Sequence, residues 1–215
     1  MRLGLLGGTF DPVHLGHLEL AGRALRIAQL DAIYFVTSVK PPHKSERTHA
    51  NFLDRHAMVA LALRGDPRLI PSSIECDREG KSYSIDTVLQ LRRLAGGTAG
   101  IFFLIGLDAF AELPTWKEFR RFSELCSFIV FSRPGYDVEL LANHLPEELR
   151  PKPVGNAEQA LALAESGRGA YLVADFASPV SSTAIRQAVR AGRSIHNLVP
   201  PDVEEYIMKT KLYLS

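Results

Sequence analysis

The chain has 215 residues, of which 46% are hydrophobic and 23% are charged, a balance typical of a globular protein with a substantial core. Its 25 Lys and Arg residues nearly cancel its 24 Asp and Glu residues, so a formal net charge of +1 provides no global field for gathering nucleic acid or a membrane surface. Any anion must therefore be bound by a local cluster of residues.

Short apolar runs alternate with helical segments along the chain. The runs are continuous and often rich in β-branched or aromatic residues, which predicts buried strands. These strands cover residues 3–6, 32–37, 69–75, 101–105, 127–132 and 171–174. Apolar residues that recur at spacings of three and four, most clearly between His14 and Leu30, predict helices. The helices cover residues 14–30, 53–64, 84–94, 157–165, 182–191 and 202–212.

The alternation of strand and helix predicts the fold class. It favours an α/β protein, a Rossmann-like doubly wound parallel sheet with helices on both faces. Because no repeat or linker interrupts the chain, we expect a single domain over residues 1–215, with a C-terminal helical part from about 181 to 215 packed on it. Ser84 is a candidate cap for the helix over 84–94.

The two cysteines, Cys76 and Cys126, have neither the spacing of a zinc site nor that of a disulfide framework. We expect both thiols to be reduced and partly buried. The first apolar run is too short for a signal peptide, and no run approaches the roughly 18 apolar residues of a membrane span. We therefore expect a soluble cytoplasmic protein without a nucleic-acid or membrane partner.

The segment from Gly7 to His17 joins the first strand to the first helix, where doubly wound sheets bind ligands. Gly7 and Gly8 allow close backbone approach, and free amides at a helix start favour an anion. His14 and His17 share one face of the first helical turn, so both can donate hydrogen bonds to phosphate oxygens. The segment is neither a GxGxxG fingerprint nor a Walker loop, and no third metal ligand is near in sequence. It predicts a phosphate site.

A second candidate site is SSTAIR at 181–186. Hydroxyls and amides at a helix start receive phosphate, and the guanidinium of Arg186 offers a fork of donors for it. Taken by itself, this segment is better explained as a serine helix cap followed by a solvated arginine. Its pairing with the segment from Gly7 to His17 favours phosphate binding.

HxGH after the first strand and SSTxIR late in the chain resemble the nucleotidyltransferase superfamily of adenylyl and cytidylyl transferases. The full set of motifs is closer to one family within this superfamily. GGTFDPVHLGH, PPHK, SYSIDT, FLIGLDAFAELPTWKEF, RPG and VSSTAIR occur in that order, which is similar to the bacterial nicotinate-mononucleotide adenylyltransferases. The resemblance runs from Leu3 to about Tyr206 and includes no functional motif between 137 and 169.

The resemblance implies two groups of site residues. ATP is expected to contact Gly8, Thr9, Phe10, His14, His17, Gly106, Asp108, Ser182, Thr183 and Arg186. Of these, His14, His17 and Arg186 are expected to be catalytic by stabilising charge on the phosphates, and Asp108 to meet the ribose hydroxyls. The mononucleotide is expected to contact Lys44, Thr87, Trp116 and Lys117.

The resemblance also implies a role for each mononucleotide contact. The pyridine ring stacks on Trp116, and its carboxylate meets Thr87 and backbone amides near Trp116 and Lys117. Lys44 reaches a phosphate. Taken from the residues alone, other interpretations stay open. Trp116 could be a core residue, Thr87 an ordinary helix residue and Lys44 a solvated charge on a rigid loop.

The expected reaction is attack by the phosphate of nicotinate mononucleotide on the α-phosphorus of ATP, which yields deamido-NAD and pyrophosphate. Because the sequence shows no carboxylate cluster for a dedicated metal, Mg²⁺ is expected to arrive with ATP. Nicotinamide mononucleotide and phosphopantetheine are alternative acceptors. A nucleotide-binding regulator and a fragment of a class I aminoacyl-tRNA synthetase are alternatives of other classes. The sequence carries no signal for the oligomeric state.

Overall fold

The computed structural model describes residues 1–39, 49–76, 78, 80–132, 145–154, 169–174, 176 and 178–214. The strands in this part of the chain are β1 (Arg2–Gly8), β2 (Ala32–Thr37), β3 (Leu69–Ser72), β4 (Gly100–Gly106), β5 (Ser127–Phe131), β6 (Lys152–Pro153) and β7 (Ala170–Val173). They form one sheet in the order β3-β2-β1-β4-β5-β7-β6. The pairs β1 with β4, β4 with β5, β5 with β7 and β6 with β7 are parallel, which confirms the predicted α/β fold.

The described helices are α1 (Leu15–Ile27), α2 (Phe52–Ala62), α3 (Ser84–Leu94), α4 (Leu107–Ala111), α5 (Phe119–Leu125), α8 (Ser182–Arg190) and α9 (Pro201–Thr210). Short 3₁₀ turns occupy Leu113–Thr115 and Glu147–Leu149. The predicted cap of α3 is wrong, because Tyr83 has the extended N-cap conformation and Ser84 is already the first helical residue. The helix predicted over 157–165 lies outside the described residues. None of the described helices is long and apolar enough to cross a membrane.

The chain divides into two compact units. Unit 1 comprises Met1–Leu6, Leu20–Ile33 and Tyr83–Ala177, and unit 2 comprises Gly7–Glu19, Tyr34–Ser82 and Ser178–Ser215. The boundary falls inside β1, α1 and β2, so each unit contains part of these three elements. The assignment of residues 1–215 to a single domain stays a prediction.

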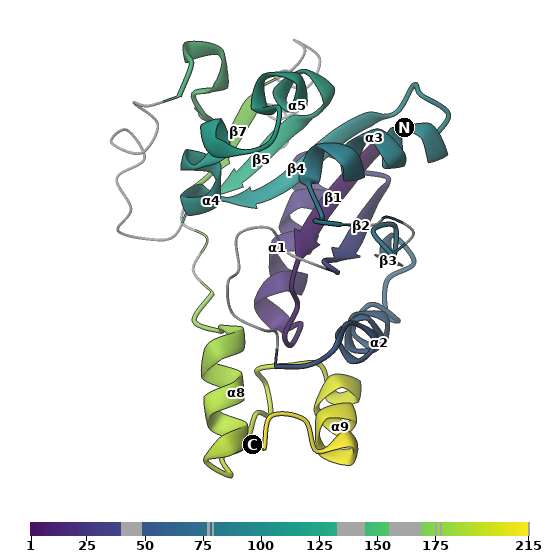
Figure 1. Cartoon of the computed structure of the whole chain (residues 1–215). Helices are drawn as coiled ribbons and strands as arrows, with labels where there is room; N and C mark the ends of the chain where they lie inside the picture. The colour runs from purple at the N-terminus through teal and green to yellow at the C-terminus, as the bar shows by residue number, and fades with distance from the viewer. Residues whose placement is uncertain are drawn as a thin grey trace. The chain divides into compact units, whose positions relative to one another are not determined.

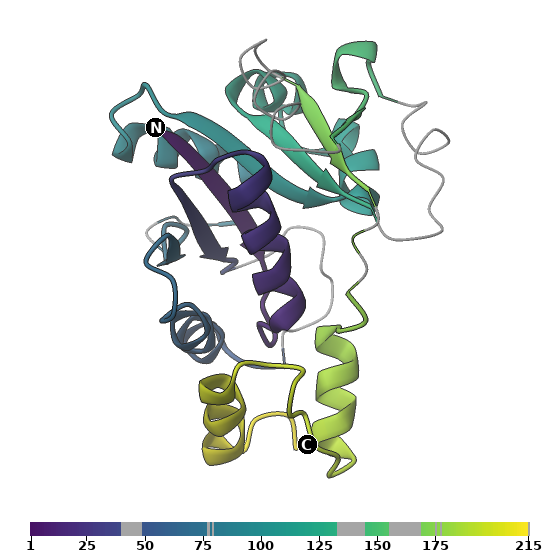
Figure 2. The same ribbon diagram turned by 180° about the vertical axis from the view of Figure 1, so that it is seen from behind.

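Unit 1 has its core around β4 and β5, whose apolar residues are almost all buried. Helices α3 and α5 lie on one face of these strands (Figure 1), and part of α1 runs along the other face of β1 (Figure 2). Between the strands and α5, Phe103, Phe122 and Phe128 meet edge to face with ring centroids 5.2–6.2 Å apart. The continuous apolar runs thus form a strand pair buried in unit 1, as their composition predicts.

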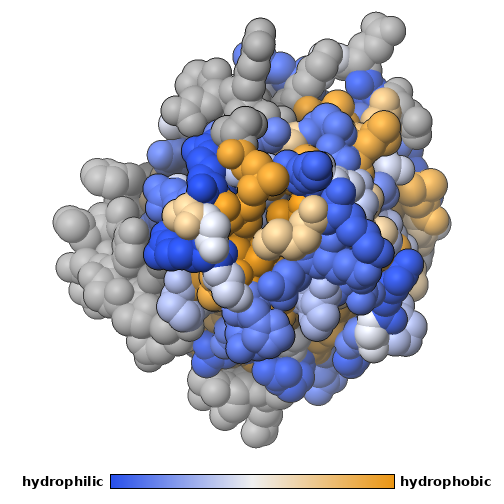
Figure 3. Space-filling view, turned by 90° about the horizontal axis from the view of Figure 1, so that it is seen from below, coloured by the Kyte–Doolittle hydropathy of each residue, from blue (hydrophilic) through white to orange (hydrophobic). Residues whose placement is uncertain are grey.

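Unit 2 is built around α2, α8 and α9 (Figure 1). The apolar faces of α8 and α9 are buried through Ile185, Val189, Val203 and Ile207. Ser181 caps α8, since its side chain accepts the N–H of Ala184. The space-filling view from below shows hydrophilic side chains around a central apolar patch, with further apolar residues toward one side (Figure 3). The helices therefore turn their polar faces outward, as amphipathic surface helices do.

The two thiols lie in different surroundings. Cys126, just after α5, is buried, and this burial raises the pKa of its thiol. Cys76 is exposed, so the expectation that both cysteines are partly buried is wrong for Cys76. The reason is that β3 ends at Ser72, and Cys76 falls in the turn that follows it.

At two glycines of unit 1, we expect substitution by alanine to change the free energy of unfolding in opposite directions. A Cβ on Gly4 would lie 2.7 Å from Cγ1 of Ile33, whereas a Cβ on Gly22, inside α1, meets nothing nearer than 3.7 Å. Gly4→Ala should lower the free energy of unfolding by about 1–3 kcal/mol through overpacking. Gly22→Ala should raise it by about 0.5–1 kcal/mol through helix propensity. Urea unfolding of both variants checks this, and equal effects would contradict the packing described for β1.

Candidate active site

Residues 9–17, which we call the histidine loop, connect β1 to α1 and include the first turn of that helix. Phe10 has φ 50°, a left-handed conformation uncommon for an aromatic residue. Its buried ring meets the imidazole of His17 edge-on and packs near Phe35, with centroids 5.0 and 5.7 Å away. A Cβ on Gly8 would lie 2.8 Å from the Phe10 ring. Glycine at position 8 therefore makes room for Phe10.

The imidazoles of His14 and His17 lie side by side, with ring centroids 3.7 Å apart. The backbone N–H of His14 donates to Nδ1 of His17 at 3.2 Å. In a neutral His17, Nδ1 is therefore the acceptor and Nε2 carries the proton. Between the two histidines, a Cβ on Gly16 would overlap the hydroxyl of Ser178. The glycine of HxGH is thus required by packing within unit 2.

Burial, and secondarily the charge of His14, lower the pKa of His17 well below its ordinary value of 6.5. His17 is consequently neutral at pH 7. It can stabilise negative charge by donating a hydrogen bond from Nε2, but it does not contribute a positive charge. This refines the expected role of the residue.

Helix α8 places the second motif against the backbone of the histidine loop. The hydroxyl of Ser182 donates to the carbonyl of Pro12 at 2.9 Å, and Nη1 of Arg186 donates to the carbonyl of Asp11 at 2.7 Å. Nη2 of Arg186 lies 3.3 Å from the hydroxyl of Thr183. The structure therefore brings the HxGH and SSTxIR motifs together, as expected for two halves of one phosphate site.

The amides at the start of α1 are less available than the sequence suggests. The N–H of Leu15 donates to the carbonyl of Leu198 at 3.0 Å, and the N–H of His14 is taken by His17. The expectation of free helix-start amides is therefore wrong for His14 and Leu15. The donors that remain for an anion include the His17 side chain and the exposed part of the Arg186 guanidinium.

The side chain of Asp11, within the histidine loop, binds two other segments of the chain. Asp11 is 6% exposed, and its carboxylate accepts the N–H of His49 at 2.8 Å and the N–H of Ala50 at 3.1 Å. It also accepts the hydroxyl of Tyr213 at 2.7 Å. Three donors from two distant segments thus satisfy this charge, as a buried carboxylate requires.

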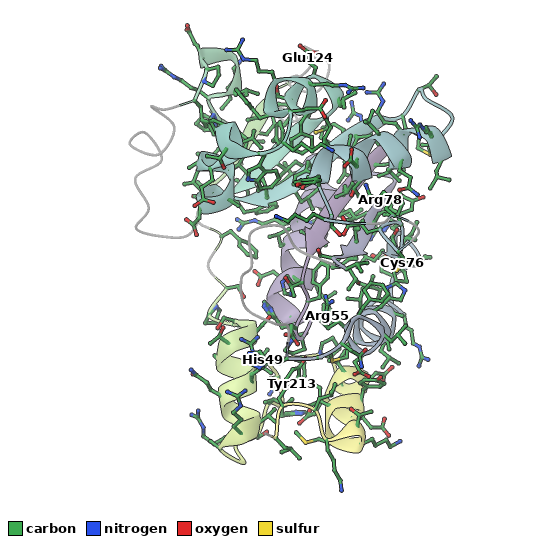
Figure 4. All side chains as sticks on the ribbon, viewed as in Figure 1. His49, Arg55, Cys76, Arg78, Glu124 and Tyr213 are labelled. Carbon is green, nitrogen blue, oxygen red and sulfur yellow. The ribbon has the colours of Figure 1, made fainter. Side chains whose placement is uncertain are left out.

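A buried arginine of α2 also binds the backbone of the histidine loop. Arg55 of α2 is 1% exposed, and its Nη1 donates to the carbonyls of Thr9 at 2.6 Å and Ser38 at 2.9 Å. Burial lowers the pKa of Arg55, and the charge of Asp11 opposes this effect. Figure 4 shows Arg55 and Tyr213 in the same part of unit 2 as His49.

Sequence reasoning missed Asp11, Arg55 and Tyr213 as parts of the site. Arg55 had a detectable signal, because it precedes the buried Met58 and Val59 by three and four residues and so lies on the apolar face of α2. Tyr213 had none, since nothing in the sequence relates it to a carboxylate 202 positions earlier.

Unit 1 carries the other predicted nucleotide contacts. Gly106 ends β4 and is the N-cap of α4, and Asp108 lies exposed in the first turn of that short helix. This position, at the carboxyl end of a central parallel strand, is where α/β sheets bind ligands. The exposed Asp108 side chain keeps its carboxylate accessible to a ribose.

The predicted acceptor residues are neighbours in unit 1. The partly exposed ring of Trp116 stacks on Phe122, with centroids 5.9 Å apart and planes inclined by 16°. Nζ of Lys117 donates to the carboxylate of Asp86 at 3.1 Å, which links this segment to the SYSIDT motif. Thr87 is buried, and its hydroxyl donates to the carbonyl of Tyr83 at 3.3 Å. The predicted Lys44 lies outside the described residues.

No three His, Cys, Asp or Glu side chains converge on a metal position within the described residues. The carboxylate of Asp11 is occupied by N–H and O–H donors, so it is not oriented as a metal ligand.

Comparisons with known proteins agree with this geometry. The model of the cytidylyltransferase-like family matches residues 5–188. A relative from Citrifermentans bemidjiense is 37% identical over all of this chain and 99% of its own length, and one from Syntrophotalea carbinolica is 38% identical over all of this chain and 98% of its own. Both carry the name "probable nicotinate-nucleotide adenylyltransferase".

The chain belongs to the nicotinate-nucleotide adenylyltransferase family. The solved structures of Plasmodium falciparum nicotinic acid mononucleotide adenylyltransferase with APC and with NaAD have TM-scores of 0.69 and 0.71. Each match covers 99% of this chain and at least 96% of the other, at 16% and 17% identity. At this identity the structures support the fold. The family membership itself rests on the curated relatives.

The lowered pKa of His17 predicts a pH-dependent stability. As the pH falls below 6.5, His17 gains a proton in the unfolded chain but not in the folded one, so the free energy of unfolding should decrease. Burial lowers the pKa of His56 too, which adds an effect of the same sign. Urea unfolding at about pH 7.5 and about pH 5.5 should show a smaller decrease in His17→Gln than in the wild type. An unchanged decrease would contradict a neutral His17.

Proposed function

We propose that this chain transfers the adenylyl group of ATP to nicotinate mononucleotide. The observation that carries the proposal is the pairing of His14 and His17 on a loop whose backbone is bound by Ser182 and Arg186 of α8. Membership of the nicotinate-nucleotide adenylyltransferase family identifies the acceptor class.

In the reaction, a phosphate oxygen of the mononucleotide forms a bond to the α-phosphorus of ATP. The bond from that phosphorus to the α–β bridging oxygen breaks, and its electron pair leaves with pyrophosphate. The attacking phosphate has a second pKa near 6, so it is already ionised at neutral pH and needs no general base. What the protein must supply is alignment of two anions and stabilisation of the charge on the leaving oxygens.

The residues of unit 2 suit this task. His17 is neutral and donates from Nε2, whereas Arg186 is a permanent cation whose guanidinium also contacts the loop. Because the loop is bound at three of its backbone carbonyls, the histidines need little reorganisation when charge develops. This preorganisation supports the assignment of His14, His17 and Arg186 as catalytic.

For the acceptor, we propose that Trp116 stacks on the pyridine ring. The ring of Trp116 is partly exposed and is backed by Phe122, an arrangement that favours a flat aromatic ligand. Lys117 and the segment of Thr87 lie beside it and would meet the pyridine carboxylate or the phosphate. Asp108 would meet the ribose of the adenylate.

Mg²⁺ is proposed to enter with the triphosphate, where it neutralises charge on the phosphate oxygens. The proposal is supported by the groups at the histidine loop that can meet phosphates, the imidazole of His17 and the guanidinium of Arg186 from α8, since the carboxylate of Asp11 is already bound by N–H and O–H donors. A cytoplasmic location is also proposed, since the thiols Cys76 and Cys126 form no disulfide.

Pyrophosphate release from ATP tests the function directly. The assay is run with nicotinate mononucleotide and with nicotinamide mononucleotide side by side, and the acid should be the better substrate. If nicotinamide mononucleotide is the better substrate, it replaces nicotinate mononucleotide as the proposed acceptor. If neither mononucleotide causes pyrophosphate release, the proposed function is wrong.

His17→Ala should reduce turnover by about 10²–10³, because one preorganised donor to the developing charge is lost. The matched control is His196→Ala, since His196 is an exposed histidine of unit 2 that pairs with Glu204 at 3.3 Å. Turnover and thermal unfolding are measured for both variants. Near-normal turnover in His17→Ala would contradict the catalytic role of the histidine pair.

Trp116→Ala should raise the KM for nicotinate mononucleotide by about tenfold, the equivalent of one stacking contact, and should change the KM for ATP much less. Trp116→Phe keeps an aromatic ring against Phe122 and should recover most of the loss. Steady-state kinetics with each substrate varied in turn measures both effects. Equal changes in the two KM values would argue against ring stacking.

A further inference from the structure

The segment after α9 turns back toward the histidine loop. Lys211 and Tyr213 both have left-handed backbone conformations, with φ of 56° and 66°. Lys211 is the C-cap of α9, where its N–H donates to the carbonyl of Ile207 and a left-handed residue is common. Away from a helix end such a conformation is unfavourable for residues other than glycine, so we expect a tertiary contact to stabilise Tyr213. The contact is made by Tyr213, whose side chain is 5% exposed and whose hydroxyl donates to Oδ1 of Asp11 at 2.7 Å.

Asp11 connects Tyr213 to the residues that we propose act on the phosphates. It lies three positions before His14, and its backbone carbonyl is the acceptor for Nη1 of Arg186. Its carboxylate is shared between Tyr213 and the amides of His49 and Ala50. A shift of Asp11 therefore moves both the histidine pair and the arginine assigned to the phosphates.

The hydroxyl of Tyr213 differs in kind from the other donors to the Asp11 carboxylate. Tyr213 contributes the one side-chain donor among the three hydrogen bonds recorded for the Asp11 carboxylate in the described residues. Phe10, immediately before Asp11, is left-handed and is constrained from both sides, by Arg55 at the Thr9 carbonyl and by Asp11 itself. Loss of the hydroxyl would let this strained loop relax.

We propose that Tyr213 is a positioning residue for adenylyl transfer: its hydroxyl fixes Asp11 and thereby orients His14, His17 and Arg186. The inference rests on the proposed function. It adds to that function a residue from the segment after α9, which makes the rate of phosphate chemistry dependent on a contact beyond the HxGH and SSTxIR motifs.

The test is Tyr213→Phe, which removes the hydroxyl and keeps the ring. Tyr206→Phe is the matched control, because Tyr206 of α9 also donates its hydroxyl to a carboxylate, that of Asp54 at 2.9 Å, which belongs to α2 and not to the histidine loop. For both variants kcat, both KM values and thermal unfolding are measured well below the melting temperatures. The ring ¹⁵N signals of His14 and His17 are recorded by NMR on the free proteins.

Tyr213→Phe should lower kcat about tenfold, with the KM for nicotinate mononucleotide nearly unchanged, because misplacement affects the transition state more than binding. It should also shift the histidine signals. Tyr206→Phe should lose similar thermal stability but keep its kcat and its histidine signals. If Tyr213→Phe behaves like Tyr206→Phe in kcat and in the NMR spectrum, the hydroxyl is only structural and the proposal is overturned.

The two proposals fail in distinguishable ways. If the wild type releases no pyrophosphate with nicotinate mononucleotide, the proposed function is removed. The histidine signals of the free Tyr213→Phe protein then still decide whether Tyr213 orients the loop: shifted signals support positioning, and unchanged signals overturn it.

Discussion

The buried carboxylate of Asp11 joins three segments that are far apart in the chain: the histidine loop, the residues just before α2 and the segment after α9. A buried charge is costly unless it is hydrogen-bonded, so each segment is held in the one arrangement that satisfies it. Left-handed conformations at Phe10 and Tyr213 cost about 1–2 kcal/mol each, and the contacts around Asp11 offset this strain. The geometry of the histidine pair depends on that carboxylate.

The backbone of the histidine loop is bound by neighbouring helices, and in the proposed function its side chains bind the ligand. The carbonyls of Thr9, Asp11 and Pro12 are all hydrogen-bonded by side chains from α2 and α8. In the proposed function, His17 is a neutral, oriented hydrogen-bond donor and Arg186 is a fixed positive charge. In a chain of net charge +1, which provides no global field, the proposed site would depend on this local cluster to attract anions.

The fold could be predicted largely from local pattern. Continuous apolar runs identify the buried strands β1, β2, β4, β5 and β7, because a strand covered on both faces needs no polar positions. The short helices α4 and α5 were not predicted, since five to seven residues are too few for a 3.6-residue period to show. The strand β3 ends at Ser72, before the end of the strand predicted over 69–75, and Cys76 lies exposed in the turn that follows.

The sequence by itself determined which residues make up the proposed phosphate site, because the glycines, the HxGH spacing and the SSTxIR helix start are local features of neighbouring residues. Only the tertiary structure decided how these groups are held. It buried Arg55 against loop carbonyls and paired Asp11 with Tyr213 across 202 positions. Periodicity and motif spacing carry no information about such partners, since a hydrogen bond between distant residues exists only after the chain has folded around it.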